Sequence, residues 1–170
     1  QTIHNNEVLQ ALLERKCELA VLFSPTDIDG ICNKEIARSE LVLVYPKKLF
    51  PHEPESISFD EIKDTEFIDI AESGPLGDLL WQRIMEENIV LPSRIKAQTY
   101  FVAARLVAKG LGVCVVDKYT ALGNLNDDIA YASFEPDLTF GIHALYLENR
   151  SLSKVSEDFL AELTKEFSTS

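Results

Sequence analysis

Short continuous apolar runs alternate along this chain with longer stretches in which apolar residues recur every three or four positions. Continuous runs are typical of strands buried in a sheet, and the wider spacing is typical of helices that pack one face against it. Strands that alternate with helices need crossover connections, so we expect an α/β fold with mainly parallel sheets. The predicted strands lie at 17–23, 41–45, 67–71, 94–97, 112–116, 129–134 and 140–147, with residues 1–4 as the end of a further strand.

Polar caps and a glycine mark where the predicted helices begin and end. Ser58, with Glu61 three residues later, forms a capping box that starts a short helix ending near residue 63. A helix over 99–109 ends at Gly110, because glycine readily adopts the left-handed conformation that closes a helix. Further helices are predicted to begin near residues 5–6, 72–75, 118 and 151–153.

The charge balance argues against direct binding of nucleic acid by this chain. Sixteen basic residues against 28 acidic ones give a formal net charge of −12, whereas a DNA-binding surface needs clustered Lys and Arg. No apolar run approaches the roughly 18 residues that cross a bilayer, and the first residues lack the basic and apolar segments of a secretory signal. Cys17, Cys32 and Cys114 are widely spaced and fit a reducing compartment. We therefore expect a cytoplasmic protein with no membrane partner.

Catalytic and cofactor motifs are missing from the sequence. It has no Gly-x-Ser-x-Gly elbow and no phosphate-binding loop. The glycines at 110 and 112 lead from a helix into a strand, the reverse of a dinucleotide fingerprint. His4, His52 and His143 lack metal-ligand spacing, and residues 27–30 lack the later oxygen ligands of a calcium loop. We expect no catalytic residue, no metal and no cofactor.

Four segments, taken in order, resemble the C-terminal effector-binding domain of LysR-type bacterial transcriptional regulators. Residues 8–23 are similar to the family's helix leading into a strand, 39–46 to a strand that crosses between its two lobes, and 140–167 to its return strand and closing helix. The most recognisable segment is 101–116, which contains LVAKGLGV at 106–113. The resemblance covers nearly the whole chain. The family's helix-turn-helix, its linker helix, and the first strand and helix of its regulatory domain have no counterpart here.

This resemblance implies a two-lobe, periplasmic-binding-protein-like α/β fold with mixed, mainly parallel sheets flanked by helices. Lobe I would comprise 1–38 with 142–170 and lobe II 39–141, joined by two crossing strands. A small effector, a carboxylate or an amino-acid-like compound, would bind between the lobes and shift the population of lobe arrangements. The family also implies a homodimer or tetramer, and contact with promoter DNA and RNA polymerase only through the full-length protein.

Strand-to-helix junctions are the expected effector contacts, because helix N-termini present free amides and positive dipole ends there. Ser73 and Thr99 can equally be plain helix caps, and Glu72 and Asp117 can be solvated loop carboxylates. Many family members carry a proline at the position of Asp117, and the variant seen here is similar to regulators that respond to opines and related amino-acid compounds. By resemblance and by their polar chemistry, the candidate effector-binding residues are Asn5, Ser24, Thr26, Glu72, Ser73, Gly74, Pro75, Thr99, Tyr100 and Asp117.

Two other functions share this pattern of elements. A periplasmic solute-binding protein of a transporter has the same two-lobe logic, although buried free cysteines argue against export. The second alternative is a small α/β enzyme whose catalytic residues lie in a missing N-terminal segment. The full-length N-terminus separates the three, because a basic helix-turn-helix, a signal peptide and a catalytic motif are readily told apart.

Overall fold

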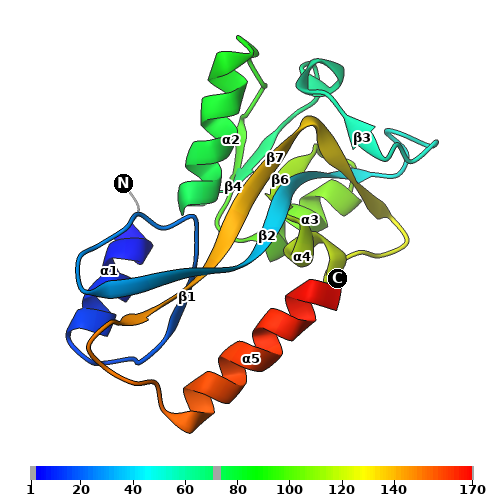
Figure 1. Ribbon diagram of the computed structural model, residues 1–170. Coiled ribbons are helices and arrows are strands. Elements are labelled where there is room, and N and C mark those ends of the chain that lie inside the picture. The colour runs from blue at the N-terminus through cyan, green and yellow to red at the C-terminus, as the bar shows by residue number, and fades with distance from the viewer. Residues whose placement is uncertain (1–2, 71–73, 170) are drawn as a thin grey trace. The chain divides into compact units, whose positions relative to one another are not determined.

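The computed structural model describes residues 3–70 and 74–169, of which 3–6, 168 and 169 are described by their backbone alone. The chain divides into two compact units, Gln1–Arg38 with Phe140–Ser170 (unit 1) and Ser39–Thr139 (unit 2). Two long strands, β2 (Ile31–Pro46) and β7 (Ile129–Leu147), contribute residues to both units (Figure 1). Unit 2 is thus one continuous segment of chain inserted into unit 1.

Unit 1 packs a helix against a small antiparallel sheet. Strand β1 (Ala20–Phe23) pairs antiparallel with β7, so that Ala20 lies opposite Leu145 and Phe23 opposite Ile142. Helix α1 (Ile3–Leu13) covers this sheet. Its apolar side chains and those of the strands form one buried cluster of Leu9, Leu12, Ala20, Ile31 and Leu145. Burial of these five side chains contributes to the stability of unit 1.

Two sequence predictions for unit 1 are wrong. Residues 3 and 4 do not end a strand, because α1 begins at Ile3 and includes His4. A lone extended segment would leave its backbone groups unpaired, whereas a helix pairs them locally. The run at 17–23 becomes a strand only from Ala20, and its pairing is antiparallel rather than parallel. A continuous apolar run reports burial and carries no information on strand direction.

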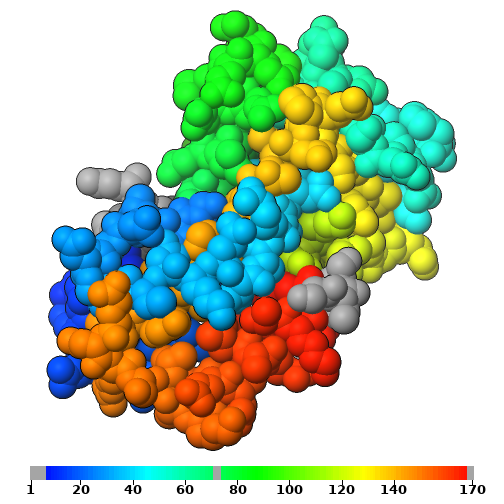
Figure 2. All heavy atoms as spheres, in the orientation of Figure 1, coloured from blue at the N-terminus to red at the C-terminus, as the bar shows by residue number. Residues whose placement is uncertain are grey.

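The last helix of unit 1, α5 (Lys154–Thr169), buries none of its described side chains. It begins beside Glu18, whose carboxylate accepts a hydrogen bond from the Ser156 hydroxyl at 3.0 Å. The Ser153 hydroxyl, predicted as a cap, accepts the Ser156 N–H at 3.3 Å. Val155 and Phe159 are 79% and 55% exposed, and the outer side chains of α5 lie on the surface shown in Figure 2.

Unit 2 is built around the second half of β2. Strand β6 (Cys114–Asp117) pairs antiparallel with it, and β3 (Ser56–Ile57) pairs parallel with β7. A second, parallel sheet joins β4 (Ile68–Ile70) to β5 (Ile95–Ala97). The remaining elements of unit 2 are the 3-10 helix η1 (Phe59–Ile62) and the helices α2 (Gly74–Glu86), α3 (Tyr100–Ala108) and α4 (Lys118–Leu122).

One buried cluster of unit 2 lies between its strands and the helices α3 and α4. It is formed by small and branched side chains that fit where a helix approaches a sheet closely. Its buried members are Val42, Val44, Ile68, Ala97, Ala103, Ala104, Val107, Cys114, Val116, Ala121 and Ile129. A stacked pair of rings, Phe59 and Phe134 with centroids 4.3 Å apart, fixes η1 against β7.

Several local predictions for unit 2 are confirmed. The Ser58 N–H and hydroxyl both donate to the Glu61 carboxylate at 2.9 Å, which completes the capping box. Thr99 is the N-cap of α3, and Gly110 follows the helix with φ +74°. One prediction is wrong: 129–134 and 140–147 are a single strand, β7. Buried Leu138 and Phe140 alternate with exposed neighbours across the polar gap, and this two-residue period continues the strand.

Among the described residues, no helix combines the length and the apolar character that a membrane crossing requires.

Candidate functional site

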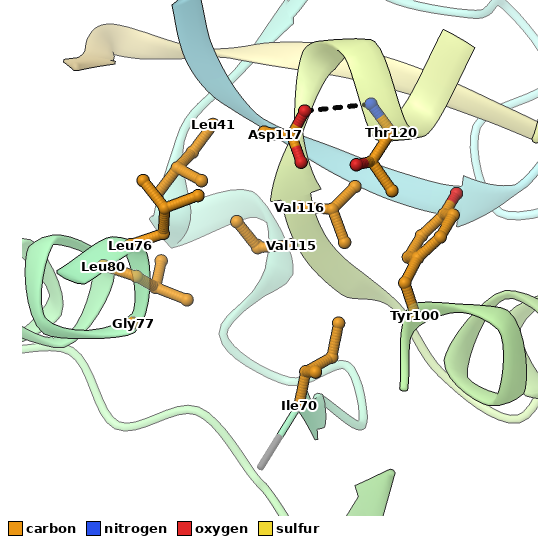
Figure 3. A pocket seen from close by; sticks show the side chains of 10 residues that line it. All are labelled: Leu41, Ile70, Leu76, Gly77, Leu80, Tyr100, Val115, Val116, Asp117 and Thr120. Carbon is orange, nitrogen blue, oxygen red and sulfur yellow. Dashed lines mark hydrogen bonds between the residues drawn. The ribbon is translucent and has the colours of Figure 1, made fainter. Parts of the chain in front are cut away.

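Three strand-to-helix junctions of unit 2 converge on one pocket. β4 ends at Ile70 before α2, β5 ends at Ala97 before α3, and β6 ends at Asp117 directly before α4. Strand β4 contacts both β5 and β6, which brings the three junctions to the same end of the unit. The pocket has a volume of about 150 Å³ and is lined by Leu41, Ile70, Leu76, Gly77, Leu80, Tyr100, Val115, Val116, Asp117 and Thr120 (Figure 3).

Polar groups occupy one side of this pocket. Asp117 caps α4, and its Oδ1 accepts the Thr120 N–H at 2.9 Å (Figure 3). The hydroxyl of Tyr100 is buried and finds no hydrogen-bond partner among the residues that the structure describes. Burial raises the pKa of Tyr100, and the thiol of Cys114 and the carboxylate of Asp117 add to the effect. Tyr100 therefore stays a neutral phenol that can both donate and accept a hydrogen bond.

Aliphatic side chains form the opposite side. Leu76 and Leu80 project from α2, and Leu41 comes from β2, across from Tyr100 and Thr120 (Figure 3). Ile70 and Val115 complete this apolar wall. A concave, mostly apolar surface with a few convergent polar groups is the usual chemistry of a small-molecule site. The pocket can therefore bind an apolar group beside a hydrogen-bonding one.

The predicted site residues of unit 2 divide into two groups. Tyr100 and Asp117 line the pocket. Thr99 is exposed and caps α3 weakly, with its hydroxyl 3.4 Å from the Val102 N–H. Gly74 and Pro75 are half-buried in the first turn of α2, just before Leu76. The predictions for Glu72 and Ser73 fall outside the described residues.

The other predicted site residues belong to unit 1, in α1 and in the loop that follows β1. Asn5 is in the first turn of α1. Ser24 follows β1 with φ +39°; its N–H donates to the Gly141 carbonyl at 2.9 Å, and its hydroxyl accepts the Gly141 N–H at 3.3 Å. Thr26 is exposed in the loop that follows. Ser24 thus holds β1 to β7, which is a structural task whether or not it also contacts a ligand.

A polar network on the unit 1 sheet includes His143. His143 Nδ1 lies 2.7 Å from Asn33 Oδ1, whose amide group donates to Asp27 at 2.7 Å. His143 Nε2 is 3.7 Å from Glu35 Oε2. Among the described residues no group of three or more His, Cys, Asp or Glu side chains could hold a metal ion.

Sequence reasoning missed most of the pocket wall. Thr120 carries a weak signal, because it stands three residues after Asp117, the spacing of a cap and its acceptor. The aliphatic members carry none, since a leucine that faces a cavity and one that faces the core have the same helical spacing. The missed lining residues are Leu41, Ile70, Leu76, Gly77, Leu80, Val115, Val116 and Thr120.

Comparison with known proteins assigns the family. Residues 1–168 match the LysR substrate binding domain. The chain belongs to that family. It is 64% identical over 164 residues to the HTH-type transcriptional regulator DgcR of Pseudoalteromonas sp, an alignment that covers 96% of this chain and 56% of DgcR. The LysR-type chain thus spans little more than half the length of that relative, and the resemblance described from its sequence is confirmed.

Solved LysR regulatory domains share the fold. The CcmR regulatory domain of Synechocystis PCC6803, in complex with 2-PG, superposes with a TM-score of 0.79 at 12% identity, covering 95% of this chain and 78% of that one. The effector binding domain of QuiR, in complex with shikimate, gives a TM-score of 0.74 at 21% identity, covering 94% and 78%. The prediction of a two-lobe, periplasmic-binding-protein-like α/β fold is confirmed by these likenesses.

Proposed function

We propose that this LysR-type chain is the ligand-sensing part of a bacterial transcriptional regulator, which binds a small carboxylate or amino-acid-like effector and so controls DNA binding allosterically. The observation that carries the proposal is the unit 2 pocket, where an unpartnered hydroxyl and a carboxylate face an aliphatic wall. The relative DgcR is named as a helix-turn-helix regulator, and CcmR and QuiR were solved with the small molecules 2-PG and shikimate. These support a sensor over a transporter component.

The proposed effector contacts are the sequence candidates at the strand-to-helix junctions. In unit 2 these are Thr99, Tyr100 and Asp117, together with the segment 72–75. In unit 1 they are Asn5, Ser24 and Thr26. The action proposed for the chain is binding and not catalysis, so that no covalent chemistry is assigned to any of these groups.

Allostery requires that the effector binds one conformation more tightly than another. A shift of a two-state population from 1:99 to 99:1 needs about 10⁴-fold preference, roughly 5.5 kcal/mol. Two or three hydrogen bonds to charged groups, each contributing about 1.5–3 kcal/mol, supply free energy of that order. The proposed site therefore has enough polar chemistry for a switch if these contacts form in one conformation only.

The further partners belong to the full-length protein. We propose a homodimer or tetramer that works in the cytoplasm and contacts promoter DNA and RNA polymerase through residues outside 1–170. The net charge of −12 supports this division, because an excess of acidic residues repels the phosphates of DNA.

A ligand screen followed by paired variants tests the proposal. Amino acids, opines and organic acids are screened by thermal shift against this chain, and hits are titrated by calorimetry. Asp117→Asn keeps an acceptor for the Thr120 N–H but removes the charge, so affinity should fall by about 10- to 150-fold. Thr99→Ala removes a cap next to the pocket, and Ser58→Ala removes a cap away from it. Both should lower the melting temperature, the cap costing about 1 kcal/mol, but only Thr99→Ala should weaken binding.

Two results would overturn the proposal. One is a hit whose affinity is the same in Asp117→Asn and Thr99→Ala as in the parent, because the effector would then bind elsewhere. The other is a full-length protein whose affinity for its promoter DNA is unchanged by every hit. The second result removes the regulatory function even where binding is real.

A further inference from the structure

We propose that the unit 2 pocket selects an aliphatic amino compound, with its ammonium group between Asp117 and Tyr100 and an apolar group of four to six heavy atoms against Leu76, Leu80 and Ile70. This inference rests on the proposed sensing function and narrows its ligand class. It uses three independent features of the pocket: an uncompensated charge, an unpartnered hydroxyl and a limited apolar volume.

The charge at the pocket is that of Asp117. The neighbouring cation, Lys118, is engaged elsewhere, since its Nζ lies 2.8 Å from Glu40 Oε1. The hydrogen bond to Glu40 raises the pKa of Lys118 and so keeps its ammonium group charged. Among the described residues Asp117 has no ion-pair partner, and one of its oxygens accepts only the Thr120 N–H. A carboxylate in a half-buried pocket attracts a ligand cation more strongly than one in open water does.

The hydroxyl of Tyr100 supplies the second contact. A buried polar group without a partner is unfavourable, and native proteins contain few of them. Tyr100 lines the same pocket as Asp117, and its hydroxyl lies on the polar side (Figure 3). An ammonium group has three N–H donors. It can donate to the Asp117 carboxylate and to the Tyr100 oxygen together. One ligand group would then pair the charge of Asp117 and satisfy the Tyr100 hydroxyl.

The volume limits the apolar part. A dry apolar cavity of about 150 Å³ holds roughly one benzene molecule, which has six heavy atoms, and the pocket measures about 150 Å³. An indole ring, with nine heavy atoms, is larger than this volume and would extend through the open side of the pocket. Leu76, Leu80 and Ile70 offer contacts without polar atoms, so each added methylene group should be favourable until the space is full.

A homologous series of probes tests these claims. Alanine, 2-aminobutyrate, norvaline and norleucine, each as both enantiomers, are titrated into the chain by calorimetry. Affinity should rise about fourfold for each methylene, and tryptophan should bind more weakly than norleucine. Hexanoate, which is norleucine without its ammonium group, should bind at least tenfold more weakly than norleucine.

A matched pair of tyrosine variants isolates the hydroxyl. Tyr45 also has a buried hydroxyl without a partner in the described part of the chain, but it does not line the pocket. Tyr100→Phe and Tyr45→Phe should both keep or raise the melting temperature of the free protein, because each removes an unpaired buried polar atom. Only Tyr100→Phe should weaken norleucine binding, by tenfold or more.

The outcomes separate the two proposals. Equal binding of hexanoate and norleucine, no gain with chain length, or an unchanged affinity in Tyr100→Phe would each overturn the ligand class. If none of these amino compounds binds while another compound from the screen binds and changes promoter affinity, the ligand class is wrong and the sensing function stands. If no compound of either set binds, both fail.

Discussion

Replacing Gly112 by alanine should be among the most destabilising small substitutions in unit 2. A Cβ at this position would overlap the backbone carbonyl oxygen of Glu66 and lie 3.2 Å from Ile68 Cγ1. That carbonyl accepts the Val113 N–H at 2.9 Å, and the Ile68 N–H donates to the Val113 carbonyl at 2.8 Å. To relieve the overlap, the start of β4 and the segment that leads into β6 have to move apart, which weakens these two hydrogen bonds.

The magnitude follows from these contacts. Overpacking of a tight site costs about 1–3 kcal/mol. Each of the two backbone hydrogen bonds, if it is lost, adds about 1 kcal/mol. A total near 3 kcal/mol lowers the melting temperature of a chain of this length by about 6–12 °C. Thermal unfolding followed by circular dichroism or calorimetry at pH 7 measures the change.

Two other glycines serve as controls. Gly123 has φ −68° and meets only ordinary contacts, so Gly123→Ala should stabilise by about 0.4–1 kcal/mol. Gly110 has φ +74° and open space around it, so Gly110→Ala should cost only the left-handed conformation, about 1–2 kcal/mol. A Gly112→Ala variant that melts within 2 °C of the parent, or no lower than Gly110→Ala, would refute the argument from close approach.

Four further predictions concern charge, reactivity and association. The Arg94 N–H and guanidinium hold the pKa of Glu66 below its ordinary value near 4.5. The stability that this contact contributes is present above pH 4.5 and is lost as the pH falls through the lowered pKa. Melting temperatures between pH 7 and 3 should therefore fall more steeply in the parent than in Glu66→Gln. Burial raises the pKa of Cys114 to about 12, so iodoacetamide at pH 8 should label the other two cysteines first, and early labelling of Cys114 by mass spectrometry would contradict its burial. Residues 1–170 alone should give no sequence-dependent gel shift with duplex DNA at physiological salt, because phosphate binding needs clustered basic residues. The chain should self-associate through the exposed apolar side chains of unit 1, and a monomer in sedimentation at high protein concentration would contradict this.

Local signals in the sequence predicted much of the fold because they depend on few residues. The Ser58 and Glu61 pair, the cap at Thr99 and the stop at Gly110 each act within one helical turn. The continuity of β7 could not be predicted from the polar residues at 135–137, because it depends on pairing with distant strands. The direction of β1 is likewise set by its partner and not by its own composition.

The candidate site was predictable only on its polar side. Asp117 directly follows the predicted strand at 112–116, and Tyr100 lies three residues after the one at 94–97; these positions carry a physical reason for ligand contact. Leu76 and Leu80 come from a helix whose spacing predicts burial alone. That their side chains border a cavity depends on where α2 lies in the folded unit, which a linear pattern does not encode.

The insertion of unit 2 between β2 and β7 has a consequence for the order of folding. Unit 1 needs residues on either side of a segment of about 100 residues, and closing a loop of that length costs about 4 kcal/mol of chain entropy before any constant term. Once Ser39–Thr139 is folded, the ends of β2 and β7 that enter unit 1 are already held by structure. We therefore expect substitutions that unfold unit 2 to destabilise unit 1 as well. Damage confined to unit 1 should leave the contiguous segment of unit 2 folded.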